Sequence, residues 1–383
     1  MNKKKILLIF GTRPEAIKMA PLYYEIKKSK CFNVEVCVTA QHRELLDQVL
    51  DIFNIKPKWD LDLMVSNQKI SNLVANIIQN LDVILDDYKP DMVLIHGDTA
   101  TTLAASVTCF LKKIKLSHVE AGLRTYKKRS PFPEEYNRRC ASLSADWHFA
   151  PTEKNVKNLI NEGIPKDKIH VTGNTVIDAL FLTLSEFESD QKKFCKLKRK
   201  IDTRLNFDID KKKFILITGH RRENFGNGFK NICEAIRELA FEYEDIYFIY
   251  PVHFNPNVKI PVNKILGNVK NIKIIEPMDY QSFIYLLSKC YLVLTDSGGI
   301  QEEAPSLGKP VIVMRADTER PEALESGTVM LSGAEKNKII NSVSNILEDK
   351  LIYKKMSMAH NPYGDGRASK KIVRQLKKIM HEE

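Results

Sequence analysis

The sequence lacks the features of several common protein classes. Its seven cysteines are odd in number and scattered, and no C-x-x-C pair occurs, so the sequence indicates neither a disulfide scaffold nor a zinc site. No apolar run approaches the length of a membrane span. The apolar run at the N-terminus is too short for the core of a signal peptide and ends in a charged turn. These absences favour a cytoplasmic protein that binds no metal and is not anchored in a membrane.

Two nucleotide-binding signatures are missing as well. No G-x-G-x-x-G turn with a downstream acidic residue follows the first apolar segment, which argues against NAD as a co-substrate. A P-loop lysine motif is also missing, so we expect the protein to need no cofactor. His96, His118 and His148 have no carboxylate or cysteine partner at metal-ligand spacing, and each is interpreted as structural.

The charge balance is basic, with 59 Lys and Arg against 48 Asp and Glu and a net charge of +11. Much of the excess is lysine on predicted helix faces and in the middle of the chain, and no aromatic-interleaved basic motif accompanies it. A solvated lysine-rich surface is therefore favoured over a nucleic-acid groove. The length of 383 residues and the hydrophobic content of 43% predict two or three globular domains.

One pattern occurs twice and is the most informative feature of the chain. Residues 3–10 form a basic start and a short apolar strand, which leads into residues 11–15 (GTRPE). Residues 211–218 repeat this pattern and lead into residues 219–224 (GHRREN). An amphipathic helix follows each turn. Because the copies lie about half a chain apart, we predict two nucleotide-fold domains that face a cleft lined by cations and helix N-termini. Such a cleft suits a substrate that carries phosphates.

Strand and helix patterns alternate along both halves, and such a βαβ series predicts a mainly parallel sheet in each. The predicted fold class is α/β, with two Rossmann-like domains whose parallel sheets face a central cleft. We expect an N-terminal domain at 1–185, a charged linker region at 186–212, a second domain at 213–365 and a basic helix at 366–383 that packs back on the first domain. The strands expected from apolar runs span residues 6–10, 34–39, 91–96, 116–119, 214–218, 246–251, 272–275, 291–295 and 310–314.

Three carboxylates lie where ligands of open α/β sheets bind, beyond the carboxyl ends of the strands. Asp98 and Glu120 each directly follow a strand, and adjacent strands would bring both within reach of one sugar. Glu134 follows a Pro-Phe-Pro loop that would position it rigidly. The alternative for Glu134 is an ordinary acid at a helix start, favoured by the helix dipole.

Cations accompany the doubled turn. Arg13 and His220 are placed to neutralise a pyrophosphate together. A lone histidine is usually structural, but His220 lies in a strand-end turn beside two arginines. Lys18 lies one turn into the first helix and either contacts the same anion or is a solvated helix residue.

A glycine-rich turn follows the predicted strand at 291–295. Ser297, Gly298 and Gly299 open a helix whose N–H groups can bind a phosphate, and Glu303 lies one turn further on, where a carboxylate can hold ribose hydroxyls. This combination favours a nucleoside diphosphate site. An ordinary βα turn is the alternative.

Together these segments resemble the non-hydrolysing UDP-N-acetylglucosamine 2-epimerases of bacteria, and the match extends along nearly the whole chain. The resemblance implies a glycosyltransferase-B-like pair of domains, a homodimer, and interconversion of UDP-N-acetylglucosamine and UDP-N-acetylmannosamine. Such mannosamine donors feed capsule and cell-wall polysaccharides. The matching segments are residues 11–21 (GTRPEAIKMAP), 96–99 (HGDT), 119–125 (VEAGLRT), 133–138 (PEEYNR), 219–224 (GHRREN), 296–305 (DSGGIQEEAP) and 318–322 (TERPE).

The resemblance also implies a route. UDP leaves by elimination, giving a 2-acetamidoglucal, and adds back after the C2 carbon is reprotonated on the other face. Charge then develops on the departing pyrophosphate and on the sugar ring. Arg13, His220 and the turn at 297–299 suit the first charge. The carboxylates suit the second as acid and base on opposite faces, and which of them acts on which face stays open: Asp98, Glu120 and Glu134.

Matched positions imply further contacts. Phe283 is the ring expected against uracil, while Met278 stands where some relatives have glutamine. The remaining nucleotide contacts implied by the family are Ser297, Gly298, Gly299, Glu303 and Arg320. Some bacterial members bind a second UDP-N-acetylglucosamine as an activator, and the residues that match that surface are Gln41, Glu135, Arg221 and His253.

Three alternatives remain open at the level of sequence. A hydrolysing 2-epimerase would release free N-acetylmannosamine and UDP, depending on whether the glucal is retained. A glycosyltransferase of the same fold would need an acceptor groove, and three sugar-facing carboxylates are more than transfer requires. A sugar-nucleotide sensor or a nucleic-acid-binding protein would not need the complete set of acids and cations.

Overall fold

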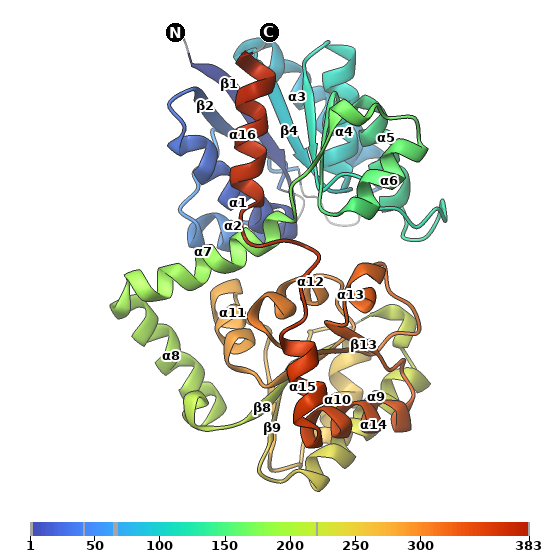
Figure 1. The fold of residues 1–383 in the computed structure, drawn as a ribbon. Coiled ribbons are helices and arrows are strands. Elements are labelled where there is room, and N and C mark those ends of the chain that lie inside the picture. The colour runs from blue at the N-terminus through green and yellow to red at the C-terminus, as the bar shows by residue number, and fades with distance from the viewer. Residues whose placement is uncertain (1–2, 41–42, 64–67, 220, 382–383) are drawn as a thin grey trace. The chain divides into compact units, whose positions relative to one another are not determined.

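The computed structural model describes residues 3–40, 43–63, 68–219 and 221–381, which fold into two compact units (Figure 1). Unit 1 comprises Met1–Phe181 and Tyr363–Glu383, and unit 2 comprises Leu182–Pro362. The chain therefore passes from unit 1 to unit 2 within helix α7 (Thr175–Ser189) and returns after Pro362. Each unit contains its own parallel sheet, as the alternating sequence pattern predicts.

The sheet of unit 1 has the strand order β3-β2-β1-β4-β5-β6-β7, with every neighbouring pair parallel. Its strands are β1 (Lys4–Phe10), β2 (Phe32–Val38), β3 (Trp59–Asp60), β4 (Met92–His96), β5 (Leu116–Val119), β6 (Trp147–Ala150) and β7 (Ile169–Val171). Its helices, besides the start of α7, are α1 (Arg13–Lys28), α2 (Arg43–Ile52), α3 (Ile70–Tyr88), α4 (Ala100–Leu111), α5 (Glu134–Ser144), α6 (Glu153–Asn161), the 3-10 helix η1 (Lys166–Lys168) and α16 (Ala368–His381).

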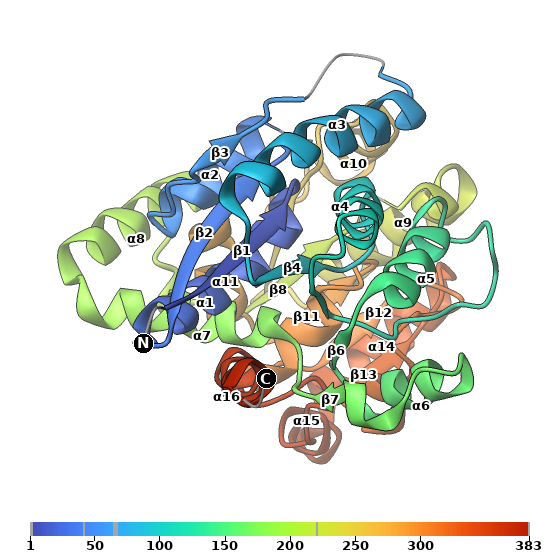
Figure 2. The same ribbon diagram turned by 90° about the horizontal axis from the view of Figure 1, so that it is seen from above.

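Helices cover both faces of this sheet, which is why its central strands are apolar throughout. Leu7 and Ile9 of β1 face a core built with α3 and α4. On the opposite side of β1 and β4 lie α1 and α16 (Figure 2). Helix α16 packs on α1 although more than 300 residues separate them in sequence, and it buries Ile372 and Leu376 completely. The C-terminal segment is thus an integral part of unit 1.

The sheet of unit 2 has the order β10-β9-β8-β11-β12-β13, again all parallel. Its strands are β8 (Phe214–Thr218), β9 (Tyr247–Pro251), β10 (Ile272–Ile275), β11 (Leu292–Thr295), β12 (Val311–Val313) and β13 (Val329–Leu331). Its helices are α8 (Gln191–Leu205), η2 (Ile209–Lys211), η3 (Arg222–Asn224), α9 (Asn227–Glu242), α10 (Pro256–Leu266), α11 (Tyr280–Lys289), α12 (Ile300–Glu303), η4 (Ala304–Leu307), α13 (Pro321–Glu325), α14 (Lys336–Glu348) and α15 (Lys350–Ser357).

The two sheets share one topology. In each, the first strand of the unit pairs with the second on one side and with the fourth on the other, so the strand order reverses at this point. β8 occupies the place of β1, and β11 occupies the place of β4. Ligands of open α/β sheets bind at such a reversal. The doubled turns at residues 11–15 and 219–224, and the turns after β4 and β11, all follow strands at these two points.

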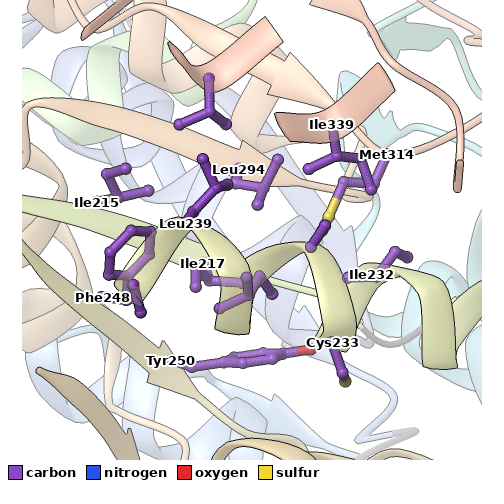
Figure 3. Close-up of a cluster of buried hydrophobic side chains, with 14 of the residues drawn as sticks. Ile215, Ile217, Ile232, Cys233, Leu239, Phe248, Tyr250, Leu294, Met314 and Ile339 are labelled. Carbon is purple, nitrogen blue, oxygen red and sulfur yellow. The ribbon is translucent and has the colours of Figure 1, made fainter. Parts of the chain in front are cut away.

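Unit 2 has its own apolar core. Ile215 and Ile217 of β8 and Phe248 and Tyr250 of β9 pack against α9, as Figure 3 shows. Tyr250 is fully buried, and its hydroxyl donates to the carbonyl of Gly219 at 3.0 Å. The core therefore supports the backbone of the turn that follows β8.

The charged stretch at 186–212, predicted as a linker region with one solvated helix, is grouped with unit 2 and is largely helical. Helix α8 buries Ile201 and Leu205, and the rings of Phe187 and Phe194 contact each other at a centroid distance of 5.4 Å. Lysines on the exposed face of α8 concealed this apolar stripe, because composition averages over both faces of a helix.

The strands that the apolar runs did not predict are short. β3, β6, β7 and β13 were not predicted, and they are two to four residues long. The strands β5, β8 and β10 have the predicted limits. Within the described ranges, no helix combines the length and the apolar character needed to span a membrane.

Candidate active site

The turn after β1 presents Arg13, the first residue of α1. Glu15, at the third helical position, reaches back and accepts hydrogen bonds from the backbone N–H groups of Gly11 at 3.0 Å and Thr12 at 2.8 Å. A Cβ atom at Gly11 would lie 2.0 Å from Oγ1 of Thr39, so a larger residue does not fit. The cap and the glycine together fix where Arg13 leaves the sheet.

Glu15 also ties this turn to the one after β4. Its carboxylate accepts a hydrogen bond from the Thr99 hydroxyl at 2.7 Å. Burial raises the pKa of Glu15 above its ordinary value, and the hydrogen bonds from Thr99 and Gly11 oppose that rise. The carboxylate of Glu15 is thus occupied in joining two strand ends.

Glu120 directly follows β5 and forms the centre of a polar cluster. Its Oε2 atom is paired with Nζ of Lys18, lies 3.5 Å from Nε2 of His96 and accepts a 2.9 Å hydrogen bond from Nδ2 of Asn174. Burial favours the protonated form of Glu120, but Lys18 and His96 outweigh it and hold its pKa well below the ordinary value. Glu120 is therefore ionised at neutral pH.

The backbone of Glu120 is also unusual. Its φ angle of 64° lies in the left-handed region, which non-glycine residues rarely adopt. Such strain persists only where the surrounding structure holds it. Gly122, with φ of 91°, has no room for a Cβ atom, which would lie 2.4 Å from the carbonyl oxygen of Asn155. The packing of α6 against this turn therefore fixes the direction of the Glu120 side chain.

Asp98 lies on the neighbouring strand end, because β4 and β5 pair in parallel. Its carboxylate contacts Nη2 of Arg138 at 2.6 Å, and its carbonyl accepts from Nδ2 of Asn137 at 2.9 Å. Burial raises the pKa of Asp98 above its ordinary value, Arg138 opposes the rise, and the charge of Glu120 adds to it. The two carboxylates thus interact, and their pKa values move in opposite directions.

Helix α5 supplies Glu134 as its first residue and Arg138 one turn later. In the part of the chain that the structure describes, the buried Oε2 atom of Glu134 has no hydrogen-bond partner. Most buried carboxylate oxygens are hydrogen-bonded, so this atom is open to a ligand. The adjacent Glu135 has a different role, because its fully buried carboxylate accepts from the backbone N–H groups of Thr125 and Tyr126, both at 3.0 Å.

The structure pairs Lys18 with Glu120 and does not leave its side chain in solvent. Its side chain is 13% exposed and paired with Glu120, so Lys18 is not a solvated helix residue.

The sequence interpretation treated three histidines as structural. Two of them form hydrogen bonds with backbone carbonyls: His118 with that of Gly97 at 2.7 Å and His148 with that of Ser142 at 2.9 Å. Burial lowers the pKa of His118 to about 3. His96 instead lies beside Glu120.

The glycine turn of unit 2 follows β11 as predicted. The backbone N–H of Ser297 donates to Oγ1 of Thr295 at 2.9 Å, and Gly299 precedes α12. Asp296, fully buried, accepts from the backbone N–H of Arg221 at 2.8 Å. This bond joins the turns after β8 and β11, much as Glu15 joins the turns after β1 and β4.

Arg320 lies against this turn. Its Nε atom donates to Glu302 at 2.8 Å and its Nη1 atom to Glu319 at 3.0 Å. A Cβ atom at Gly298 would lie 3.2 Å from the guanidinium carbon of Arg320, so the absence of a side chain there admits the cation. The structure thus brings Arg320 to Ser297 and Gly298, although it lies more than twenty positions later in the sequence.

The remaining predicted nucleotide contacts, Glu303 and Phe283, lie on α12 and α11 of unit 2. Oε1 of Glu303 accepts from the hydroxyl of Tyr280 at 3.2 Å, and Tyr280 begins α11, which also carries Phe283. Phe283 is half-buried, so part of its ring is open to solvent. Helix α11 therefore positions both the partner of Glu303 and the expected uracil contact.

The residues matched to a second nucleotide are spread over both units. His253 is exposed after β9, Arg221 lies beside Asp296, and Glu135 is committed to the loop at 125–126. The catalytic prediction for His220 and the prediction for Gln41 fall outside the described residues. Among the described residues, no cluster of three His, Cys, Asp or Glu has metal-binding geometry.

Sequence reasoning missed three residues that the site uses. Glu15 had a usable signal, since Thr12 and Glu15 form the Thr-x-x-Glu pattern of a capping box. Arg138 and Asn174 had none, because their partners Asp98 and Glu120 are 40 and 54 residues away. Contacts of this range depend on how the strands are ordered.

The whole chain has close relatives. It matches the family model described as UDP-N-acetylglucosamine 2-epimerase over residues 24–377. It is 52% identical to the UDP-N-acetylglucosamine 2-epimerase of Yersinia pestis over 373 residues, 97% of this chain and 98% of the relative. The identity is also 52% to that of Campylobacter jejuni over 380 residues, 99% of each chain.

Solved protein structures also match this chain. A crystal structure of UDP-GlcNAc 2-epimerase from Neisseria meningitidis bound to UDP-GlcNAc matches with a TM-score of 0.90 at 52% identity, covering 98% of this chain and 100% of that one. The enzyme from Methanocaldococcus jannaschii, in complex with UDP-GlcNAc and UDP, matches with a TM-score of 0.81 at 34% identity, covering 98% and 99%. These matches confirm the predicted glycosyltransferase-B-like class with two Rossmann-like domains.

Proposed function

Because this chain belongs to the UDP-N-acetylglucosamine 2-epimerase family, we propose that it interconverts UDP-N-acetylglucosamine and UDP-N-acetylmannosamine. The reaction inverts C2 of the sugar. The C2 proton is not adjacent to a carbonyl, so its direct removal by a side chain is too slow. Elimination solves this difficulty: the C1–O bond breaks, UDP departs, and a base takes the C2 proton to leave a 2-acetamidoglucal. Protonation of C2 on the other face and re-addition of UDP at C1 complete the exchange.

The observation that carries this proposal is the pair of carboxylates at the ends of β4 and β5. Two neighbouring carboxyl groups with pKa values pushed apart are the arrangement that divides acid from base. Glu120, whose pKa is lowered by Lys18 and His96, is the ionised member and the proposed base. Asp98, whose pKa is raised by burial, is the member that more readily carries a proton and is the proposed acid.

We assign Glu134 to the same sugar-facing set. Its unpartnered Oε2 atom lies at the start of α5, the helix whose Arg138 contacts Asp98. A carboxylate oxygen there is available to a sugar hydroxyl or to positive charge that develops at C1. Arg13 is assigned to the departing pyrophosphate, together with His220.

We assign the uridine diphosphate to unit 2. The turn at 297–299 offers backbone N–H groups, and Arg320 supplies a charge held by Glu302 and Glu319. Glu303 is the proposed partner of the ribose hydroxyls, and Phe283 is the proposed ring against uracil. Lys18 is assigned to positioning Glu120 as well as to the substrate.

We also propose an oligomeric state, a regulatory site and a cellular role. We propose a cytoplasmic homodimer, regulated by a second UDP-N-acetylglucosamine near Gln41, Glu135, Arg221 and His253, that supplies a mannosamine donor for capsule or cell-wall polysaccharide. Static light scattering would give about twice the 43.9 kDa of one chain for a dimer. A monomer mass at micromolar concentration would exclude it. Stimulation of UDP-N-acetylmannosamine turnover by trace UDP-N-acetylglucosamine is expected for the regulatory site.

One experiment tests the function against its rivals. The protein is incubated with UDP-N-acetylglucosamine in D₂O, and the products are followed by NMR. Deuterium at C2 of both UDP-sugars supports epimerisation by elimination. Free N-acetylmannosamine as the main product would indicate a hydrolysing enzyme. Exchange that requires an added acceptor would indicate a transferase, and no turnover would indicate a binding protein.

A further inference from the structure

We infer that Asn174 is a positioning residue for Glu120, and that the C-terminal segment 363–369 holds Asn174 in place. This inference rests on the proposed role of Glu120 as the base. Asn174 follows β7 and precedes α7, and its side chain is almost fully buried. Because Asn174 does not ionise, it has no proton to exchange with the sugar and acts through Glu120.

The contacts of Asn174 define how its amide is oriented. Its Oδ1 atom accepts a hydrogen bond from the backbone N–H of Val176 at 3.1 Å. Its Nδ2 atom, on the other side of the amide, donates to Oε2 of Glu120 at 2.9 Å. Only this orientation satisfies both partners, since a backbone N–H needs an acceptor and a carboxylate needs a donor.

Glu120 requires such a donor for two reasons. Its backbone lies in the left-handed region, so the side chain leaves the strand end in a direction that local geometry alone does not favour. Its strongest partner, Lys18, is a long flexible side chain that attracts the carboxylate without fixing its rotation. A buried amide on a short side chain supplies the missing directional contact.

The segment 363–369 contacts Asn174 directly and also contacts Asp178, one turn further along α7. The backbone N–H of Asn174 donates to the carbonyl of Tyr363 at 2.7 Å. The flanking glycines allow this approach, because a Cβ atom at Gly364 would lie 3.3 Å from Cα of Gly173. One turn into α7, the Asp178 carboxylate accepts from the N–H groups of Ala368 at 3.0 Å and Ser369 at 2.8 Å.

The segment therefore connects the far end of the chain to the proposed base. Asp178 binds the first turn of α16, where the helix dipole favours a carboxylate. Tyr363 then holds the backbone of Asn174, and the Asn174 amide holds Glu120. The charged and titratable groups around Glu120 in this cluster are Lys18, His96 and Asp98.

A purely structural role for Asn174 is the competing explanation, since Oδ1 also caps the start of α7. Two substitutions separate the roles. Asn174→Asp keeps the size and the acceptor for Val176 but directs a second carboxylate at Glu120. Asn174→Ser keeps a good capping residue and removes the donor. If Asn174 only caps the helix, both variants work as well as the wild type.

We expect kcat to fall at least about tenfold in both variants, with KM changed by less than about threefold, because the nucleotide is assigned to residues of unit 2 and Asn174 belongs to unit 1. In Asn174→Asp, the acid limb of the pH–kcat profile should also move to higher pH, because a like charge raises the pKa of Glu120. If both variants retain wild-type kcat and an unshifted acid limb, the inference is wrong. If Asn174→Asp fails to fold, the Ser variant decides.

A matched control is Asn271→Asp. Asn271 is also a buried donor, but its Nδ2 atom donates to three backbone carbonyls of unit 2, at 2.8 to 3.2 Å. This variant should lose stability while the folded fraction keeps its kcat and pH profile. The D₂O assay on the wild type runs in parallel. If the wild type shows no C2 exchange, the proposed function fails, whereas an active wild type with active Asn174 variants overturns this inference alone.

The role of the segment has its own test. Asp178→Ala releases residues 368 and 369 and should lower kcat several-fold. Because the effect passes through Asn174, adding Asn174→Ser should cost little further activity, so the two losses should be clearly non-additive. Fully additive losses, or wild-type kcat in Asp178→Ala, would show that the segment does not position Asn174.

Discussion

The charge and role of a glutamate in this protein depend on what surrounds it. Glu15 and Glu135 are buried and the side chain of Glu120 is 8% exposed, and Lys18 and His96 hold the pKa of Glu120 well below its ordinary value. Glu15 and Glu135 accept hydrogen bonds from backbone N–H groups and so serve the architecture of the turns. Glu120 instead interacts with the side chains of Lys18, His96 and Asn174, and it is the residue that we propose as the base.

The lowered pKa of Glu120 predicts a pH dependence of stability. A carboxylate with a depressed pKa stabilises the fold above its unfolded value, near 4.5, and loses this contribution as pH falls toward its folded pKa. The unfolding free energy of wild type minus Glu120→Gln should therefore be largest near neutral pH. It should shrink below about pH 4.5, by about 1.4 kcal/mol for each pH unit within that window.

Urea denaturation from pH 6 to pH 3.5 measures this difference. A difference that stays constant over the range would mean that the pKa of Glu120 is not depressed. Lys18→Met provides the complementary variant. Without its cation, the folded-state pKa of Glu120 moves back toward its unfolded value, so the loss of stability below about pH 4.5 should be smaller than in the wild type.

Gly298 predicts a binding defect without a folding defect. A methyl group there would press on the guanidinium of Arg320, at 3.2 to 3.5 Å, and displace it from the turn. Gly298→Ala should weaken UDP binding about tenfold, measured by calorimetry, with little change in stability. Gly228→Ala in α9 is the control, because its Cβ atom meets Ala334 at an ordinary 3.4 Å. Equal UDP affinity in both variants would remove Arg320 from the proposed phosphate site.

At the scale of elements, the site is an arrangement of strand ends joined by carboxylates. Glu15 joins the turns after β1 and β4, and Asp296 joins the turns after β8 and β11. Both lie where the strand order reverses, where diverging loops leave backbone N–H groups without sheet partners. A buried carboxylate that accepts from these groups fixes the two neighbouring turns relative to each other.

Glu15→Ala should therefore destabilise unit 1 substantially. The N–H groups of Gly11 and Thr12 and the Thr99 hydroxyl lose their acceptor, and each such buried group costs roughly 1–3 kcal/mol. We expect a loss of about 3 kcal/mol by chemical denaturation. Glu15→Gln retains one acceptor oxygen and should lose less than half as much. A loss under about 1 kcal/mol for Glu15→Ala would mean that water replaces the carboxylate.

At the scale of the whole molecule, the two units share one topology, and in the proposed function they have different tasks. Each has its own core, so each can respond separately to a core substitution. Unit 1 includes α16, which arrives from the end of the chain and packs on α1 (Figure 1). The stability of unit 1 therefore depends on α16.

Leu376→Asp tests this dependence. Leu376 of α16 is fully buried, and a carboxylate there should cost several kcal/mol. Hydrogen exchange in urea should show earlier opening of unit 1, with protection of β8 and β11 in unit 2 unchanged. Lys377→Asp places the same residue on the exposed face and should have little effect. Parallel loss of protection in both units would mean that they unfold together.

Much of the molecule is determined locally. Apolar runs predicted β5, β8 and β10 at their observed limits, and the α/β class followed from their alternation with helices. Local patterns did not reveal α8 as part of unit 2 or the very short β3. A two-residue strand has no periodicity, and the charged face of α8 outweighed its apolar stripe in composition.

The sequence by itself determined which residue types stand at the carboxyl ends of the strands: Asp98, Glu120 and the turn at 297–299. It could do so because each is contiguous with its strand, and parallel strands bring these ends to one edge. Only the tertiary structure decided their partners. Glu120 is ionised because residues 18, 96 and 174 converge on one oxygen atom, and Asn174 is held by a segment nearly 200 residues away. Strand order and helix packing create those contacts, and no local pattern encodes them.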